Sequence, residues 1–283
     1  MKYLVLGASG MAGHIICQYL DAQGHEVIGY CRRSVDFKNI IKGDVRDTHK
    51  LSELIVNERF DAVVNAVGIL NSSADDDTEN AVYMNSYLPH WLAKVACDME
   101  TQIIQMSTDC VFSGNSGPYS ENSLRDGTSF YARTKALGEL EDNKNLTIRT
   151  SVVGPDINPD GIGLLNWFMR QNDAKGYTKA MWTGVSTLEL AKYIEFATIN
   201  KRKGLVHLVN GSNISKYNLI RLFNRYFRED SVKIVPYDGY ATDKTLLLDK
   251  KKLGYEVPSY EEMIRELADW VSENIERYPH YKN

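Results

Sequence analysis

Tyr131 and Lys135 are two side chains whose types and spacing could carry out acid–base chemistry. Residues four apart share one face of a helix. A nearby ammonium group favours the phenolate and lowers the pKa of a tyrosine from its ordinary value of about 10. The phenol could then donate a proton to a developing alkoxide near neutral pH. The same spacing also fits an amphipathic surface helix, so the surrounding elements must decide between the two.

The segment Ser107-Thr108-Asp109 comes directly after an apolar strand expected at residues 102–106. In a doubly wound sheet the carboxyl ends of the strands face the ligand crevice. A hydroxyl group there could hydrogen-bond the carbonyl oxygen of a substrate. Thr108 is therefore a candidate partner of Tyr131, although a turn or a helix N-cap uses the same residue types.

A glycine-rich segment, GASGMAG at residues 7–13, separates the first expected strand from the first expected helix. The tight turn favours residues without a Cβ, and the N–H groups that open the helix can bind a pyrophosphate. The spacing Gly-x-x-Gly-x-x-Gly is a variant of the common dinucleotide fingerprint, and a turn without a ligand is the alternative. The predicted dinucleotide-binding residues of this segment are Gly7, Ser9, Gly10, Met11, Ala12 and Gly13.

Arg32 and Arg33 stand at the end of the second expected strand, where NAD-binding proteins place an acidic residue. Guanidinium groups suit the 2′-phosphate of NADP by charge and by bidentate geometry. The two arginines therefore predict NADPH as the cofactor, with NADH as the alternative. Either of them could instead be a solvated surface residue.

The elements that would position these residues are strands and helices that alternate along the chain. Apolar patterns predict strands at 2–6, 26–30, 61–67, 102–106 and 146–150, with a short apolar piece at 40–41. They predict helices at 14–23, from Asp47 as N-cap to about 57, at 81–99 and at 131–142. Strands that alternate with helices form β-α-β units, so we expect an α/β fold with a doubly wound parallel sheet.

The alternation of strands and helices becomes less regular beyond residue 154. Helices are expected at 164–171 and 187–199, from a Ser215 cap to about 227, and from a capping box at Ser259–Glu262, with short strands at 205–209 and 232–236. We expect an NADP-binding domain made of residues 1–153, about 183–211 and 233–248. A smaller, interleaved substrate-binding domain would comprise about 154–182, 212–232 and 249–283.

The composition of the 283 residues is that of an ordinary globular protein, 43% hydrophobic and 25% charged, with a net charge of −4. No dense run of Lys and Arg is present, so no nucleic-acid partner is expected. The four cysteines and six histidines lack metal-ligand spacing, and Asp75-Asp76-Asp77 fits a helix N-terminus or a solvated loop, so no metal is assigned. A signal peptide and a stretch of about 20 apolar residues are lacking, so we expect a cytoplasmic protein without a membrane partner.

The strings GASGMAG (7–13), STDCVFSG (107–114) and YARTK (131–135) together resemble the extended short-chain dehydrogenases/reductases. Within them, the chain is most similar to the dTDP-4-dehydrorhamnose reductase-like group. RTSVVG at 149–154 and WTGVSTLELAK at 182–192 resemble later segments of that group. The resemblance extends over most of the chain.

This resemblance implies a catalytic triad of Thr108, Tyr131 and Lys135 and a nucleotide-sugar substrate. NADPH would deliver a hydride to C4 of a nucleotide-linked 4-keto-6-deoxy sugar, in deoxysugar and surface-polysaccharide synthesis. Tyr131 would protonate the C4 oxygen, Thr108 would orient it, and Lys135 would hold the nicotinamide ribose and lower the pKa of the phenol. Asp109 would also lie at the substrate.

The same match implies further cofactor residues. Asp44 and Val45 would lie beside the adenine, and Ala66, Val67 and Gly68 would lie along the cofactor. Asn85 would be a structural asparagine near the site, or a polar residue on the side of a helix.

The sequence departs from the group at two positions. Cys110 stands where the group usually has an aromatic residue, and Val152 stands where a tryptophan near the sugar is frequent. These departures concern the identity of the sugar and leave the hydride chemistry intact. Trp182 could supply an aromatic wall at the substrate instead, or it could be a core residue.

Two other functions fit the same fold. A sugar-nucleotide epimerase or dehydratase would retain NAD, but Arg32 and Arg33 argue against NAD, and the Asp-Glu pair of the dehydratases is absent because Cys110 follows Asp109. A non-catalytic, NADP-binding regulatory subunit, like that of methionine adenosyltransferase, resembles the same group. The intact triad favours an enzyme. A homodimer is expected because symmetric dimers are common among soluble enzymes.

Overall fold

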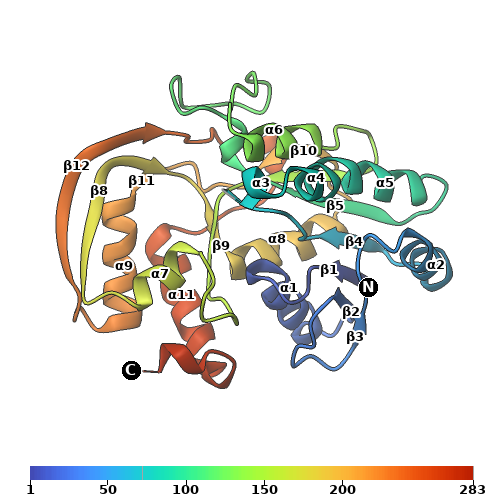
Figure 1. Ribbon diagram of the computed structural model, residues 1–283, viewed down its shortest axis with the longest axis horizontal. Helices are drawn as coiled ribbons and strands as arrows, with labels where there is room; N and C mark the ends of the chain where they lie inside the picture. Colours follow the sequence, from blue (N-terminus) through green and yellow to red (C-terminus); the bar gives the residue numbers. More distant parts are fainter. Residues whose placement is uncertain (72, 283) are drawn as a thin grey trace. The chain divides into compact units, whose positions relative to one another are not determined.

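The computed structural model describes residues 1–71 and 73–282, which divide between two compact units (Figure 1). The first unit comprises Met1–Ser113, Leu124–Arg149 and Ala191–Val206. The second comprises Gly114–Ser123, Thr150–Leu190 and the chain from His207 onward. Each unit therefore combines segments that are far apart in the sequence.

A seven-stranded sheet forms the centre of the first unit, in the order β10-β6-β5-β4-β1-β2-β3. The pairings that connect β6 to β3 across the sheet are parallel. The strand order reverses between β1 and β4, and such a point marks the ligand edge of a doubly wound sheet. The expected α/β fold is confirmed. The strands are β1 Lys2–Leu6, β2 Glu26–Cys31, β3 Ile40–Lys42, β4 Ala62–Asn65, β5 Gln102–Ser107, β6 Leu146–Arg149 and β10 Gly204–His207.

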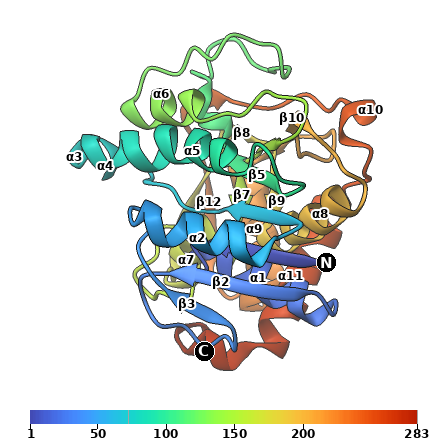
Figure 2. The ribbon, with the colours of Figure 1, turned by 90° about the vertical axis from the view of Figure 1, so that its right-hand side faces the viewer.

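Helices cover both faces of this sheet, with α1 on one side and α2 and α5 on the other (Figures 1 and 2). Side chains alternate along a strand, so Leu4 and Leu6 of β1 share one face, where they join the core cluster of α2 and α5. Tyr3 and Val5 are buried on the opposite face. The helices are α1 Met11–Ala22, α2 Thr48–Glu58, α3 Ser73–Asp76, α4 Thr78–Val82, α5 Leu88–Val95 and α6 Phe130–Leu137, with shorter turns η1 Tyr83–Tyr87 and η2 Asp109–Val111.

The single helix expected at residues 81–99 is interrupted, so that prediction is wrong. A π-helical turn, η1, separates α4 from α5, and α5 ends at Val95. Pro89, in the first turn of α5, has no N–H group to donate to the carbonyl of Asn85, four residues earlier. Apolar periodicity continues through this point and cannot reveal the missing hydrogen bond.

The helix expected at residues 131–142 ends at Leu137. A Cβ at Gly138 would lie 1.8 Å from the backbone oxygen of Asn85. Only glycine permits this close approach, and it marks the C-cap of α6. The sequence pattern extended the helix because Glu139–Asp142 continue with good helix formers.

The second unit contains a three-stranded sheet, β11-β8-β12, and a pair of short strands, β7 with β9. β12 pairs in parallel with β8, and Figure 1 shows the two as long neighbouring strands beside α9. The rings of Phe168 on α7 and Phe223 on α9 lie 6.0 Å apart. The elements are β7 Val152–Val153, α7 Leu164–Met169, β8 Asp173–Trp182, β9 Val185–Ser186, β11 Ile214–Ser215, α9 Lys216–Arg228, β12 Lys233–Asp243, α10 Lys250–Leu253, α11 Tyr260–Glu273, η3 Ile275–Arg277 and η4 Pro279–Tyr281. α8, Thr187–Ile199, passes from the second unit into the first.

The two units differ from the expected division of the chain. Residues 233–248 lie in the second unit because β12 pairs with β8, and residues 114–123, 183–190 and 207–211 lie there as well. β8 itself was not expected. In its first half the exposed positions carry Asp, Lys and Tyr and the buried positions carry only Ala and Gly, so this half has no large apolar side chain on its buried face. The assignment of cofactor and substrate binding to particular segments stays a prediction.

Of the helices formed by residues 1–71 and 73–282, none combines the length and the apolar character that crossing a membrane requires.

Candidate active site

Thr108, Tyr131 and Lys135 are brought together in the first unit. Thr108 follows β5 and caps η2, where its Oγ1 accepts a hydrogen bond from the backbone N–H of Cys110 at 3.1 Å. Tyr131 and Lys135 lie on α6, which begins after Ser129, whose hydroxyl accepts the N–H of Ala132 at 3.1 Å. The three side chains belong to residues that are only 8%, 8% and 5% exposed.

The Thr108 side chain lies near enough to the Tyr131 hydroxyl to influence its titration. Burial raises the pKa of Tyr131 well above its ordinary value, and the Cys110 and Asp109 side chains raise it further, while the Thr108 side chain lowers it. Lys135 is not among the groups that shift this pKa, so the lowering expected from Lys135 stays a prediction. The phenol stays protonated at neutral pH, which is the form that can donate a proton.

Lys135 directs its ammonium group at the backbone of β5. Its Nζ donates a hydrogen bond to the carbonyl oxygen of Met106 at 2.5 Å. Burial lowers the pKa of Lys135 to about 8, and the carboxylate of Glu139 opposes this effect. The ammonium is thus held beside the end of β5, in a position set by the backbone.

The glycine segment forms the turn between β1 and α1. The N–H of Gly7 donates to the carbonyl oxygen of Tyr30 at 2.9 Å, and its φ of +83° is a conformation that favours glycine. A Cβ at Gly13 would lie 2.1 Å from the backbone oxygen of Gly7, so α1 can approach the turn only because residue 13 is glycine.

This turn fits the phosphates of a dinucleotide. Gly10 is the N-cap of α1, and within the described part of the chain no side chain bonds to the first N–H groups of that helix. The N-terminus of the twelve-residue helix α1 therefore presents N–H groups and a positive dipole end to an anion. The segment Ala66–Gly68 follows β4, beside Gly7.

Asn85 connects the segment after β4 to α6. Its Oδ1 accepts the N–H of Ile69 at 2.9 Å, and its Nδ2 donates to the Ile69 carbonyl at 3.0 Å and to Oγ1 of Thr134 at 3.1 Å. The side chain is completely buried and lies on the π-helical turn. These bonds support the structural role expected for Asn85.

The residues expected around the adenine and its ribose lie at the ends of β2 and β3. Arg32 and Arg33 follow β2 and are exposed, and Asp44 and Val45 follow β3. Arg46 was not expected to contribute: its Nε and Nη2 donate to the Asp44 carboxylate at 3.2 and 2.8 Å. These bonds lower the pKa of Asp44, so its carboxylate is ionised and held in place.

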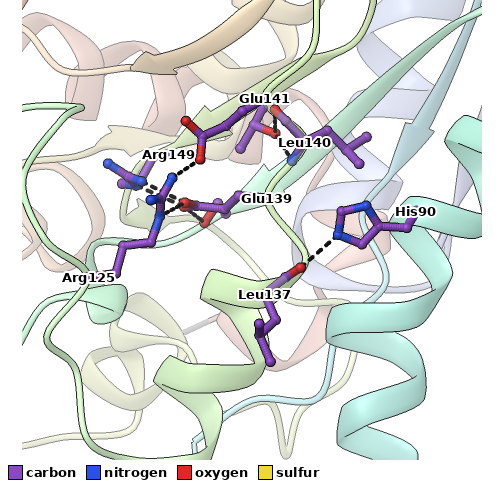
Figure 3. Close-up of polar contacts among 9 residues, drawn as sticks. His90, Arg125, Leu137, Glu139, Leu140, Glu141 and Arg149 are labelled. Atoms are coloured by element: carbon purple, nitrogen blue, oxygen red, sulfur yellow. Dashed lines mark hydrogen bonds and ion pairs between the residues drawn. The ribbon is translucent and has the colours of Figure 1, made fainter.

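A buried ion network next to the triad also escaped the sequence analysis. The Glu139 carboxylate accepts hydrogen bonds from Arg149 and Arg125 (Figure 3). It also accepts one from the Ser107 hydroxyl. Arg149 and Glu139 come from β6 and from the segment after α6. Their sequence distance of ten residues gives no periodic signal, although a buried arginine in a strand requires a partner.

Asp109 and Trp182, the remaining candidate substrate residues, lie in different units. Asp109 is buried and accepts a hydrogen bond from the Thr108 hydroxyl at 3.1 Å. Trp182 ends β8, is 4% exposed and donates its indole N–H to the Ser151 hydroxyl at 2.8 Å. Its ring centroid lies 5.6 Å from that of Tyr260. This packing is that of a core tryptophan, and a contact with the substrate stays a prediction.

The three consecutive aspartates at 75–77 lie in and between two short helices. Asp75 and Asp76 lie in α3, and Asp77 caps α4 by accepting the N–H of Asn80 at 3.1 Å. The interpretation as a cluster of charges at a helix N-terminus agrees with this arrangement.

Comparison with known proteins places this site in a family. The "Probable low-salt glycan biosynthesis reductase Agl14" of Haloferax volcanii is 31% identical over 166 residues, which are 57% of this chain and 51% of that protein. The dTDP-4-keto-6-deoxy-D-glucose reductase of Streptomyces niveus is 24% identical over 253 residues, 85% and 84% of the two chains. Methionine adenosyltransferase 2 subunit beta of Xenopus laevis is 26% identical over 163 residues, 55% and 48%. The matches to the first and third of these relatives span about half of their length.

A solved structure shows the same fold. The dTDP-4-dehydrorhamnose reductase of Clostridium acetobutylicum superposes with a TM-score of 0.78 over 96% of this chain and 100% of its own, at 22% identity. The family model of the RmlD substrate binding domain matches residues 1–245. The chain therefore belongs to the RmlD substrate binding domain family, as its resemblance to the dTDP-4-dehydrorhamnose reductase-like group of extended short-chain dehydrogenases/reductases led us to expect.

Proposed function

We propose that this chain is an oxidoreductase that uses NADPH to reduce the ketone of a nucleotide-linked 4-keto-6-deoxy sugar, in deoxysugar and polysaccharide synthesis. The observation that carries the proposal is the proximity of the Tyr131 and Thr108 side chains at the carboxyl end of β5, with Lys135 buried near the same strand end. The glycine turn after β1 belongs to the same sheet edge. Relatives that are named as reductases support the same class of reaction.

Tyr131 acts as the proton donor in this proposal. Its raised pKa keeps the phenol protonated, so it can give its proton to the C4 oxygen as a hydride reaches C4. When bound, NADPH would supply that hydride and become NADP⁺, and the ketone would become an alcohol. The Thr108 hydroxyl holds the carbonyl oxygen, and Lys135 binds the nicotinamide ribose through its ammonium group.

NADPH is preferred to NADH in this proposal because of the charges at the end of β2. Arg32 and Arg33 are exposed there, so a 2′-phosphate could pair with their guanidinium groups. Asp44, held by Arg46, stands at the end of the next strand, where the adenine is expected.

The test is a reductase assay that follows the absorbance of the reduced nicotinamide. The protein is mixed with NADPH or NADH and with an enzymatically generated dTDP-linked 4-keto-6-deoxy sugar, and a UDP-linked 4-keto sugar serves as the parallel substrate. We expect NADPH oxidation with one of them, and a loss of about 10²- to 10⁴-fold in kcat for Tyr131→Phe. The variant should bind NADPH as the unmodified protein does. No turnover with either substrate and either cofactor would contradict the proposal.

A second candidate is a non-catalytic, NADP-binding regulatory subunit. The similarity to methionine adenosyltransferase 2 subunit beta favours it. Tight NADPH binding without any turnover, unchanged in Tyr131→Phe, would favour this candidate over the reductase.

A further inference from the structure

Glu139 is a buried carboxylate that has no part in the proton and hydride steps proposed above. Its side chain is 1% exposed. It accepts hydrogen bonds from the Ser107 hydroxyl at 2.6 Å and from Nε and Nη2 of Arg149 at 2.9 and 2.6 Å. Nε of Arg125 is its fourth donor. Figure 3 shows both guanidinium groups directed at this carboxylate.

These bonds join the ends of three elements around the triad. Ser107 is the last residue of β5 and directly precedes Thr108. Arg149 is the last residue of β6, and Glu139 follows α6, four residues after Lys135. The carboxylate therefore links the helix that carries Tyr131 and Lys135 to the strand that leads into Thr108.

We propose that Glu139 is a positioning residue of the active site: by binding Ser107 and Arg149 it fixes α6 against the end of β5, and so sets where Thr108 and Lys135 stand. The inference rests on the proposed reductase function. It adds a role for a side chain that takes no part in the proton and hydride steps proposed above.

Rigid partners make Glu139 suited to this role. Arg149 is completely buried, and its guanidinium group lies over the ring of Phe112, 5.0 Å from the centroid. Its two hydrogen bonds to one carboxylate fix the orientation of both groups. A partner held in this way cannot follow Glu139 if the carboxylate moves, so the geometry at Ser107 depends on the whole network.

The charges around Glu139 keep the network ionised. Burial by itself would raise its pKa, but the hydrogen bonds and charge of Arg149, with Ser107 and Arg125, lower the pKa of Glu139 below its ordinary value. Arg125 also pairs with the exposed Glu141. Toward Lys135, the Glu139 charge counteracts the effect of burial and favours the ammonium form. Removal of this charge should therefore deprotonate Lys135 at a lower pH.

The experiment compares Glu139→Gln with Glu141→Gln in the full chain. Both variants remove a carboxylate that binds Arg125, but only Glu139 also binds Ser107 and Arg149. We expect Glu139→Gln to lower kcat roughly 10-fold or more with KM changed less than about twofold, because misplacement of catalytic groups costs rate and not binding. Glu141→Gln should keep the kcat of the unmodified enzyme, and Glu139→Asp should recover part of the lost rate.

A second measurement needs no turnover. The Lys135 side chain is followed by NMR as the pH is raised, in protein labelled with ¹³C-lysine, and its signal is assigned by its loss in Lys135→Met. We expect the Lys135 pKa in Glu139→Gln to fall by about one unit or more, and to be unchanged in Glu141→Gln. This titration tests whether Glu139 acts on Lys135 even if none of the sugar substrates is reduced, so a failure of the proposed function is seen separately.

If Glu139→Gln does not fold, Ser107→Ala takes its place. This change removes one bond from the carboxylate and leaves the pair of Glu139 with Arg149. We expect it to lower kcat roughly fivefold or more through the same loss of position. A folded Glu139→Gln with the kcat and the Lys135 pKa of the unmodified protein would overturn the proposal, and so would a Ser107→Ala variant with full kcat.

Discussion

Two glycines of the turn after β1 should respond differently to substitution by alanine: one variant should lose stability and the other should lose affinity for NADPH. In Gly13→Ala, the new Cβ would lie 2.1 Å from the backbone oxygen of Gly7 and 2.7 Å from its carbonyl carbon. Both are backbone atoms, so no side chain can rotate away. The turn and α1 would have to separate by about 1 Å to restore ordinary contact in a close-packed interior.

The magnitude follows from two opposing terms. Overpacking of a filled site costs about 1–3 kcal/mol, whereas alanine is preferred over glycine inside a helix by about 0.5–1 kcal/mol. We therefore expect Gly13→Ala to lower the free energy of unfolding by about 1–2 kcal/mol. At about 2–4 °C per kcal/mol, the melting temperature should fall by roughly 3–6 °C.

Gly10→Ala is the matched control. Its φ of −91° suits any residue, and the nearest heavy atom to the new Cβ is the Gly7 oxygen at 3.3 Å. Stability should change by less than about 0.5 kcal/mol. The methyl group would stand at the N-terminus of α1, where the pyrophosphate is expected, so the Kd for NADPH should rise roughly tenfold or more.

Thermal unfolding by circular dichroism and titration of NADPH fluorescence measure the two effects separately. We expect Gly13→Ala to melt early and Gly10→Ala to melt normally but bind NADPH weakly. A Gly13→Ala variant that melts at or above the temperature of the unmodified protein would refute the packing argument. NADPH binding that is unchanged in Gly10→Ala would refute the assignment of the phosphate site.

Four further predictions concern the cofactor, the pH dependence of the rate, the pH dependence of stability, and the support of α6. Replacement of Arg32 and Arg33 by serine should raise the Kd for NADPH at least about tenfold and leave the Kd for NADH within about twofold. Fluorescence titration measures both values. Equal effects on the two cofactors would argue against a 2′-phosphate contact. Because burial lowers the pKa of Lys135 to about 8, kcat/KM should fall as the pH rises through about 8 and the ammonium is lost, whereas a rate that stays flat to pH 10 would contradict this role. The same depressed pKa means that the unfolded chain binds more protons than the folded one above pH 8, so the contribution of Lys135 to stability should increase between about pH 8 and 10.5, and Lys135→Met should abolish that increase. Asn85→Ala leaves the N–H and carbonyl groups of Ile69 without a partner and should cost about 2–3 kcal/mol in urea unfolding; a loss below about 0.5 kcal/mol would show that Asn85 is dispensable to this fold.

Local patterns in the sequence were sufficient for the sheet and for the residues that could do chemistry. The apolar strands, the glycine turn and the caps at Asp47, Ser215 and Ser259 depend on interactions between neighbouring residues, and the structure contains each of them. The spacing of Tyr131 and Lys135 likewise fixes their common helix face before any tertiary contact forms.

The ends of the helices near the site could not be predicted from such patterns. The break at Tyr83–Tyr87 depends on Pro89 and on the contacts that Asn85 makes with Ile69 and Thr134, which are 16 and 49 residues away in the sequence. The end of α6 at Gly138 depends on the oxygen of Asn85. Periodicity counts apolar residues within a window and does not register partners that lie outside it.

The sequence by itself determined the fold class and the dinucleotide turn, because short-range spacing and residue type decide those features. The candidate triad came from the resemblance of its sequence motifs to a known family. Only the tertiary structure decided the electrostatic environment of the triad. Burial raises the pKa of Tyr131 and lowers the pKa of Lys135. The carboxylate of Glu139, after α6, binds Arg149 at the end of β6 and Ser107 at the end of β5. Desolvation and charge pairing act over distances in space, and a one-dimensional pattern contains no such distances.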